Sequence, residues 1–265
     1  MSRRKESLMI ANYHAHTTRC NHAQGTEEEY IRCALEAGLQ IMGFSDHTPY
    51  FFPKNHSSPF RMTPQELPEY VQTVLALRKA YAGRIQIPLG LEVEYYPQFF
   101  PELLPFLQDH GIEYMLLGQH FLFNEIECVG SAGPTADVAH LRQYCDQTIE
   151  AMYTGRFTYF AHPDLVRFMG SDQVYRREIL RLCRAAKECQ VPLEINLLGF
   201  REGRHYPNRR FWEIAAEENC PVVLGVDAHQ PQHSCHRQAL QMAHDLVADL
   251  QLPLLDTVPL RPLKA

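Results

Sequence analysis

Residues 8–16 read LMIANYHAH, a mostly apolar run that ends directly in two histidines. A run this short, bounded by polar residues, is typical of a buried strand rather than of a helix. His14 and His16 are two residues apart, so along a strand their rings point to the same side. The stretch therefore predicts a buried strand that presents two imidazoles at its carboxyl end.

The rest of the chain repeats this arrangement. Six further apolar runs, separated by amphipathic stretches of helical length, occupy residues 39–45, 85–93, 112–118, 157–161, 191–197 and 221–226. The first amphipathic stretch opens with the capping-box pair Thr26 and Glu29 and closes at Gly38. Regular alternation of strands and helices predicts parallel strands with right-handed crossovers. Seven such units predict an α/β fold with a closed or nearly closed barrel; a doubly wound open sheet is the alternative.

The chain reads as one domain. No linker, low-complexity segment or internal repeat interrupts residues 1–265. The longest connection, 48–64, contains four aromatic residues and four prolines, and we interpret it as a possible lid over a site.

Composition excludes several classes of function. The formal net charge of -6 argues against a nucleic-acid groove, which needs a basic stripe. No apolar run approaches the roughly 20 residues that span a bilayer. The eight cysteines are scattered without a C-x-x-C pair, which is typical of free thiols in a reducing compartment. We therefore expect a cytoplasmic protein without nucleic-acid or membrane partners, and the sequence leaves its oligomeric state open.

Acidic or histidine side chains accompany all seven predicted strands. In chain order these residues are His14 and His16, Asp46 and His47, Glu92 and Glu94, His120, His162 and Asp164, Glu194 with Asn196, and Asp227 and His229. In α/β barrels the carboxyl ends of the strands form the functional face. We therefore expect these groups to meet in one cavity, except that Glu94 supports a ligand or lies at the surface and Asp164 caps a turn after Pro163.

Imidazole combined with carboxylate suits zinc, iron or manganese and differs from the all-oxygen sites of calcium. The predicted donors are too many for one tetrahedral ion, so they indicate two to three divalent ions. Clustered divalent metals bind the attacking and leaving oxygens of a phosphoester and lower the pKa of bound water. The pattern therefore predicts metal-dependent hydrolysis of a small phosphorylated substrate.

Seven motifs then resemble a known family. HAHTTRCNHA, FSDH, GLEVEY, LLGQHF, YFAHPDLV, LEIN and GVDAH follow the order and spacing of the PHP superfamily (polymerase and histidinol phosphatase). HTTRCNHA, AHPDLVRF and EINLLGFREGRHYPN are most similar to the monofunctional histidinol-phosphate phosphatases. The resemblance implies a distorted seven-stranded (β/α) barrel with a trinuclear metal centre.

The resemblance also assigns roles to residues. It implies that one ion is bound by His14, His16, Glu92 and Asp227, a second by Glu92, His120 and His162, and a third by His22, His47 and His229. It further implies catalytic roles for Asp46, Asp227 and His229, with Asp46 orienting His47 or an attacking water. The implied phosphate-binding residues are Arg167, Arg201 and, less directly, Arg204.

The activity implied by the resemblance is hydrolysis of L-histidinol phosphate in cytoplasmic histidine biosynthesis. Leu197 and Leu198 replace small polar residues of that family, and Val226 stands where a serine is common. These departures lie beside the substrate pocket and leave two alternatives open. One is a PHP phosphoesterase for another small phosphate ester or a nucleotide; the other is a non-catalytic metal-binding module.

Overall fold

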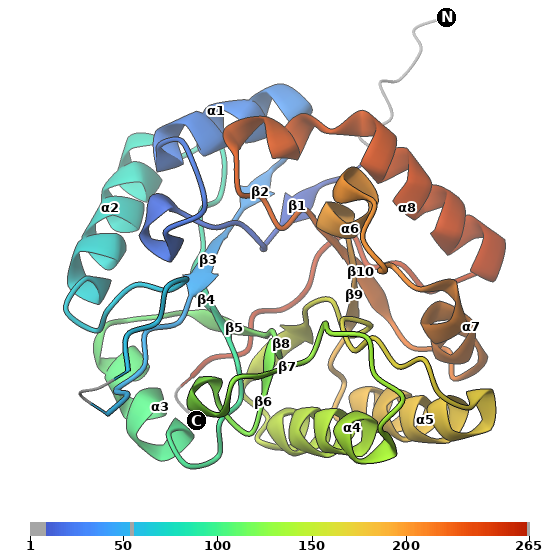
Figure 1. Ribbon diagram of the computed structural model, residues 1–265. Coiled ribbons are helices and arrows are strands. Elements are labelled where there is room, and N and C mark those ends of the chain that lie inside the picture. The colour runs from blue at the N-terminus through green and yellow to red at the C-terminus, as the bar shows by residue number, and fades with distance from the viewer. Residues whose placement is uncertain (1–8, 54–55, 264–265) are drawn as a thin grey trace, which may run out of the picture.

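The computed structural model describes residues 9–53 and 56–263. Its main sheet is parallel, six-stranded and curled, with strand order β10-β9-β8-β5-β4-β3. These strands are β3 (Phe44–His47), β4 (Leu89–Val93), β5 (Tyr114–Leu117), β8 (Phe157–Phe160), β9 (Leu193–Asn196) and β10 (Val222–Gly225). The predicted alternation of parallel strands and helices is confirmed, and helices lie around the outside of the curled sheet (Figure 1).

The first predicted strand does not join this sheet along its length. Instead β1 (Ala11–Asn12) pairs with β2 (Ile41–Met42) in a separate two-stranded sheet. The second predicted strand is split at Gly43, where a Cβ would lie 2.4 Å from the Tyr114 hydroxyl. That hydroxyl donates hydrogen bonds to the carbonyl oxygens of Tyr13 and Phe44, at 2.7 and 3.0 Å. The tyrosine thus occupies the place where ladder bonds would continue, and the sheet has six strands instead of the seven predicted.

The longer connections form the helical layer. The α-helices are α1 (Glu27–Ala37), α2 (Leu67–Ala80), α3 (Phe100–Asp109), α4 (Val138–Tyr153), α5 (Asp172–Glu188), α6 (Leu197–Glu202), α7 (Arg209–Glu217) and α8 (Arg237–Leu250). Helix α1 begins with the predicted capping box of Thr26 and Glu29 and ends at Gly38, whose φ is 85°. No helix in residues 9–53 and 56–263 is both long enough and apolar enough to cross a membrane.

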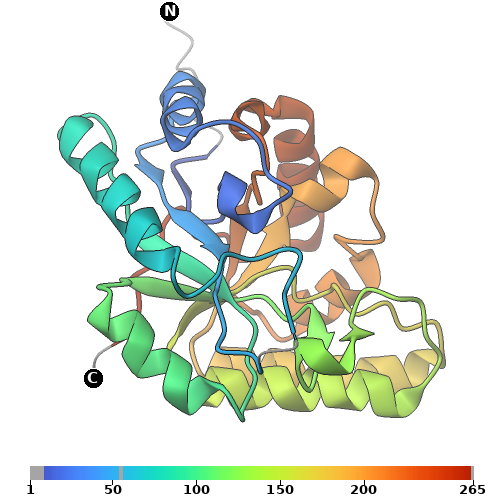
Figure 2. The ribbon, with the colours of Figure 1, turned by 60° about the vertical axis from the view of Figure 1, so that its left-hand side comes forward.

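Smaller elements lie at the carboxyl edge of the sheet. They are the hairpin of β6 (Phe121–Leu122) and β7 (Val129–Gly130) and the 3-10 helices η1 (Thr18–Cys20), η2 (Glu125–Glu127) and η3 (Pro231–Cys235). The connection between β3 and α2 leaves the sheet at this edge (Figure 2). This edge therefore carries the irregular backbone that surrounds the candidate site.

The opposite end of the curled sheet is filled by aromatic side chains. Tyr13, Tyr114 and Tyr159 pack together, with ring centroids 6.0 and 6.4 Å from Tyr13. In the β4–β5 register Gly90 pairs with Tyr114 and Glu92 with Leu116, so this layer lies two residues toward the amino end from Glu92.

The C-terminal segment 251–263 covers this tyrosine layer. Val222 donates a backbone hydrogen bond to Pro253 at 3.0 Å. The Tyr13 hydroxyl lies 3.5 Å from the carbonyl oxygen of Val258, which belongs to the same cluster of side chains. The floor of the candidate site therefore rests on a packed layer.

Candidate metal centre

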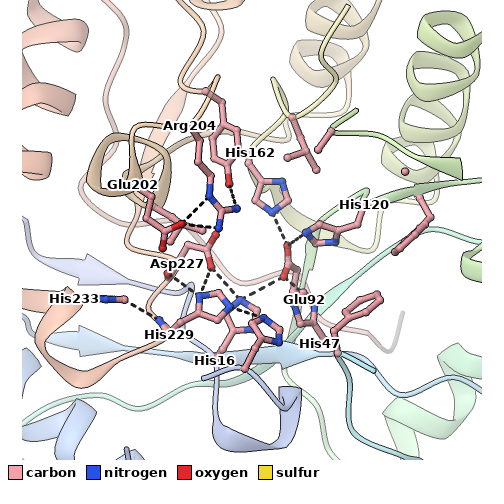
Figure 3. A pocket seen from close by; sticks show the side chains of 18 of the residues that line it. His16, His47, Glu92, His120, His162, Glu202, Arg204, Asp227, His229 and His233 are labelled. Carbon is pink, nitrogen blue, oxygen red and sulfur yellow. Dashed lines mark hydrogen bonds and ion pairs between the residues drawn. The ribbon is translucent and has the colours of Figure 1, made fainter. Parts of the chain in front are cut away.

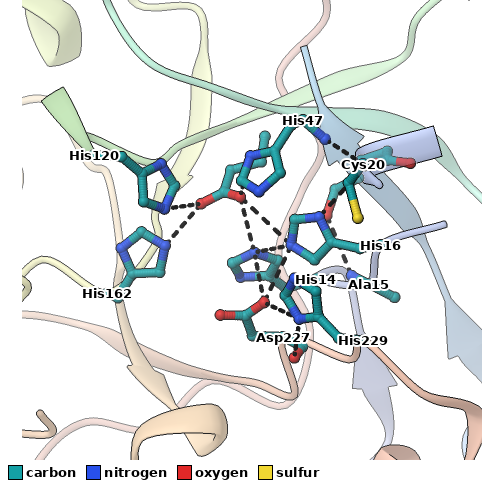
Figure 4. Close-up of polar contacts among 12 residues, drawn as sticks. His14, Ala15, His16, Cys20, His47, His120, His162, Asp227 and His229 are labelled. Atoms are coloured by element: carbon teal, nitrogen blue, oxygen red, sulfur yellow. Dashed lines mark hydrogen bonds and ion pairs between the residues drawn. The ribbon is translucent and has the colours of Figure 1, made fainter. Parts of the chain in front are cut away.

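The structure brings all nine predicted ligands together around two buried carboxylates. Glu92, on β4, is 1% exposed, and Asp227, just after β10, is 4% exposed. Figure 3 shows the imidazoles of His47, His120 and His162 around the Glu92 carboxylate, and Figure 4 shows those of His14, His16 and His229 beside Asp227. The nine residues come from six separate segments of the chain: His14, His16, His22, His47, Glu92, His120, His162, Asp227 and His229.

Glu92 is contacted from several sides by imidazole nitrogens. Its Oε1 lies 2.7 Å from Nε2 of His162 and 3.7 Å from Nε2 of His120. Its Oε2 lies 3.2 Å from Nδ1 of His47 and 3.5 Å from Nε2 of His16. Burial favours the protonated carboxyl, but the imidazoles, His120 foremost, hold the pKa of Glu92 well below its ordinary value. Glu92 is therefore placed to bridge two groups of donors.

Asp227 connects the remaining histidines. Its Oδ1 lies 3.1 Å from Nε2 of His16 and 3.4 Å from Nδ1 of His229. The Nε2 of His229 in turn lies 2.9 Å from Nε2 of His22. Burial lowers the pKa of His229 far below its ordinary value and keeps the ring neutral, which is the form that binds metal.

Buried atoms without hydrogen-bond partners indicate what the group lacks. His47 Nδ1, which faces Glu92, and Asp227 Oδ1, which faces His16, are both buried and make no hydrogen bond. Buried polar atoms are normally paired, and leaving one unpaired costs about 1–3 kcal/mol. The donors also converge in threes within 4.8 Å of one another, for example His14 with His162 and Asp227. Donor type and geometry both fit divalent cations of the zinc, iron or manganese kind.

Local backbone geometry directs two of these side chains. His162 and Asp227 both follow strands and have positive φ, 33° and 49°. Such values are rare for residues other than glycine and tend to occur at functional sites. Asn12 ties the first and last segments together, because its Oδ1 accepts from the backbone N–H groups of His14 and Val226 at 3.2 and 3.0 Å.

Several supporting residues were not assigned a role from the sequence. Glu194 Oε1 lies 2.8 Å from Nδ1 of His14, and Asn196 donates to Asp227 at 3.1 Å. The sequence did contain an indication of these roles, because Glu194 and Asn196 lie at the end of a predicted strand, as the proposed ligands do. Glu94, expected at the surface or supporting a ligand, is buried and contacts His120 Nδ1 at 2.9 Å. Arg61, which pairs with Glu94, lies in a loop without hydrophobic periodicity, so the sequence analysis assigned it no role.

Asp46 lies beside His16 rather than toward the imidazole of His47. Its Oδ1 is 3.5 Å from Nδ1 of His16, and its other oxygen accepts from the backbone and hydroxyl of Thr17. The contact between His47 and Asp46 is made by the backbone N–H of His47, which donates to Oδ1 at 2.8 Å. Asp46 is also absent from the cavity lining in the described residues, so orientation of His16 is the role that its contacts favour.

The three predicted phosphate-binding arginines are placed differently. Arg204 lines the cavity, where it donates to the Tyr206 hydroxyl at 3.0 Å and pairs with Glu202 at 2.7 Å. Arg201 donates to the carbonyl oxygens of Val226 and Asp227, both at 3.2 Å. Arg167 is exposed, and neither it nor Arg201 lines the cavity in the described part of the chain. Helix α6 ends at Gly203, whose φ of 63° lets the chain turn and bring Arg204 to the cavity.

Eight of the nine candidate ligands line the floor of a cavity of about 740 Å³, and the ninth, His14, is fully buried beneath it. Apolar walls rise from it through Phe60, Phe121, Leu165 and Leu198, and Figure 3 shows Arg204 and Glu202 on the side opposite His120. Leu198 thus lies in the pocket as expected, whereas Leu197 and Val226 pack into the core. The volume is that of a small-molecule site.

Comparison with known proteins places this site in a family. Residues 12–197, which contain seven of the nine predicted ligands, match the PHP domain. A probable histidinol-phosphatase of Deinococcus radiodurans is 32% identical over 231 residues, covering 84% of this chain and 87% of that protein. The histidinol-phosphatase of Bacillus subtilis is 26% identical over 249 residues, covering 82% and 92%.

A solved structure shares the fold. Histidinol phosphate phosphatase from Lactococcus lactis, complexed with Zn, L-histidinol and phosphate, superimposes with a TM-score of 0.71 at 18% identity, covering 94% of this chain and 98% of that one. The resemblance predicted from the sequence motifs is thereby confirmed. The chain belongs to the PHP domain family, and histidinol-phosphatases are among its relatives.

Proposed function

We propose that this protein is a metal-dependent phosphomonoesterase that hydrolyses L-histidinol phosphate to L-histidinol and phosphate. The observation that carries the proposal is the cluster of nine His, Glu and Asp donors that includes Glu92, eight of which line the floor of a small-molecule cavity. The assignment of L-histidinol phosphate as the substrate is supported by the names of the Deinococcus and Bacillus relatives. It is also supported by the L-histidinol and phosphate bound to the Lactococcus enzyme.

The donors divide into three groups that share Glu92 or adjoin it. We propose that His14, His16, Glu92 and Asp227 hold one divalent ion, Glu92, His120 and His162 a second, and His22, His47 and His229 a third. Ions bound there supply Lewis-acid stabilisation of the phosphoryl oxygens and a hydroxide nucleophile at neutral pH. Zinc, iron and manganese all suit these donors.

The remaining residues bind and orient the substrate. Arg204 presents its guanidinium to the cavity beside the Tyr206 hydroxyl, where it can donate two hydrogen bonds to phosphate oxygens. Phe60, Leu165 and Leu198 exclude water from the organic part of the ester. Although burial favours the protonated carboxyl, the pKa of Asp227 is held well below its ordinary value by the surrounding histidines, so this carboxylate is ionised. Asp227, or the neutral ring of His229, would take the proton released by the attacking water and pass it to the leaving alkoxide. No covalent phosphoenzyme is needed.

The test compares purified protein on L-histidinol phosphate and on a panel of small phosphate esters and nucleotides. We expect the highest kcat/KM for L-histidinol phosphate. A flat profile would instead support a general PHP phosphoesterase, and bound metal without hydrolysis at any pH would support the metal-binding module.

Single turnover in oxygen-18 water should label the first phosphate released, and unlabelled phosphate would exclude direct attack by water.

We also propose that residues 1–265 form one domain whose sheet is completed by the segment after β1 as a seventh strand. Two hydrogen bonds support this closure: His16 N donates to Ala228 O at 2.9 Å and Ser45 N to Ala15 O at 2.8 Å.

A cytoplasmic location is proposed as well, supported by the eight cysteines, all of which are free.

A further inference from the structure

Arg61 is a buried cation outside the proposed donor set. It lies in the connection between β3 and α2 and is 4% exposed. Its guanidinium makes two parallel hydrogen bonds to Glu94, at 3.0 and 3.1 Å, and a third to Glu125 at 2.8 Å. Its Nη1 also donates to the Thr48 carbonyl at 2.7 Å. Burial of a charge costs several kcal/mol unless it is paired, and here two carboxylates pair with it.

Arg61 is connected through Glu94 to the candidate ligand His120. Glu94 Oε1 accepts from Arg61 and also lies 2.9 Å from Nδ1 of His120. A carboxylate at Nδ1 keeps the proton there, so the lone pair of His120 lies on Nε2, which faces Glu92 Oε1 at 3.7 Å. Arg61 acts on the Nδ1 side of His120 through Glu94, because it fixes the carboxylate that orients the ring.

The second contact leads to the wall of the cavity. The guanidinium of Arg61 lies 4.5 Å from the ring centroid of Phe60, which lines the cavity. Phe60 stacks on Phe121 with centroids 5.6 Å apart and meets the His47 ring edge-on at 5.3 Å. One side chain therefore holds both a ligand-orienting carboxylate and an aromatic wall.

We propose that Arg61 is a positioning residue with two effects. Through Glu94 it sets how tightly the centre binds a divalent ion at His120, and through Phe60 it sets how well the cavity binds the organic part of the substrate. The second effect rests on the proposed function, whereas the first rests on the donor geometry alone.

The experiment measures Zn²⁺ affinity by competition with a chromophoric chelator, and KM for L-histidinol phosphate. In Arg61→Gln and Glu94→Gln we expect the affinity for one ion to fall about 10- to 100-fold, the usual effect of removing a group that orients a ligand. Phe60→Leu should raise KM several-fold and lower the Zn²⁺ affinity less than Arg61→Gln does, because it keeps the Arg61–Glu94 pair. Arg61→Lys should recover only part of the affinity, because lysine cannot make two parallel bonds to Glu94.

The matched control is Arg78→Gln. Arg78 makes two similar bonds to Glu113, at 2.9 and 2.6 Å, in a pair that does not line the candidate cavity. We expect unchanged Zn²⁺ affinity and unchanged KM in this variant. An equal loss of Zn²⁺ affinity in Arg78→Gln would mean that any lost Arg–Glu pair weakens the centre, and would overturn the proposal.

Wild-type Zn²⁺ affinity in Arg61→Gln, with an unchanged circular-dichroism spectrum, would also overturn it. If Arg61→Gln does not fold, the near-isosteric Glu94→Gln decides by the same readout. The two proposals fail separately: a wild-type protein that does not hydrolyse L-histidinol phosphate refutes the function, while the change in Zn²⁺ affinity still tests the role of Arg61.

Discussion

Some single residues supply the carboxylates of the site, and others leave the space that these carboxylates occupy. A Cβ on Gly118 would lie 2.0 Å from Glu92 Oε1, and one on Gly225 would lie 1.4 Å from Glu194 Oε1. At both positions the absence of a side chain is needed because a carboxylate occupies the space. Such glycines carry no chemistry, yet they determine where the proposed bridging group can lie.

Gly118→Ala should therefore damage the centre selectively. The added methyl group displaces the Glu92 carboxylate, so metal content and kcat should fall together, by at least about 10-fold in activity, as expected when a catalytic group is misplaced. Elemental analysis and steady-state kinetics measure both. The control is Gly111→Ala, where the φ of 73° costs about 1–2 kcal/mol of stability but no atom crowds the methyl group. Full metal content in Gly118→Ala would contradict this account.

Arg204, which lines the cavity, and Arg201, which lies behind it, are expected to have different roles because they contact different groups. Arg204→Ala should raise KM for the phosphate ester by roughly 10-fold, the effect of losing one to two charge-assisted hydrogen bonds, and leave metal content unchanged. Arg201→Ala should instead lower metal content, because it removes two bonds to the backbone around Asp227. Elemental analysis beside kinetics distinguishes the two. A change in KM alone in Arg201→Ala would return that residue to phosphate binding.

At the scale of elements, the strand ends could be predicted and the connections could not. Alternation of apolar runs with amphipathic stretches located the strands, and the register of parallel strands brings their polar ends to one edge. The split at Gly43 depends on Tyr114, which lies 71 residues further along the chain. The role of Arg61 likewise depends on loop geometry, which leaves no periodic pattern in the sequence, and Arg204 could be named only from the family resemblance.

Helices α4 and α5 are joined by a charged cluster that gives a pH-dependent contribution to stability. Glu178 on α5 is 2% exposed and accepts from Arg177 and, across the interface, from Arg142 at 3.3 Å. Burial raises the pKa of this carboxyl, but the guanidinium groups outweigh it and hold the pKa below its ordinary value. A lowered folded-state pKa stabilises the protein above the unfolded-state pKa and loses this contribution as the pH falls through the folded-state value.

Glu178→Gln should accordingly lower the free energy of unfolding by about 1 kcal/mol at pH 7, since the arginines are half exposed and become solvated. The difference from wild type should shrink as the pH falls below about 4, where the wild-type carboxyl is protonated in the unfolded chain. Urea titrations of chelator-treated protein at several pH values measure it. A difference that does not vary with pH would contradict the proposed linkage.

At the scale of the whole molecule, the proposed centre connects the first and last segments of the sheet. His14 and His16, which precede β2, contact both Glu92 on β4 and Asp227, which follows β10. Ions that bind the folded chain alone stabilise it by about 3–4 kcal/mol at 100 to 1,000 times their Kd. Bound metal should therefore act as a long-range cross-link.

Chelation should lower the melting temperature by on the order of 10 °C, the shift that this free energy gives for a chain of this size. Differential scanning calorimetry with and without a chelator, followed by addition of Zn²⁺, measures the loss and its recovery. Identical transitions in both states would mean that no ion stabilises the fold.

The tyrosine layer and the segment 251–263 pack across the amino end of the curled sheet, so we expect substrate and products to pass through the side of the cavity lined by Phe60 and Arg204. On the proposed function, phosphate binds the metal centre at the floor and should therefore leave after the alcohol product. Product inhibition should then be competitive with orthophosphate and noncompetitive with the alcohol, and the reverse pattern would imply a second exit.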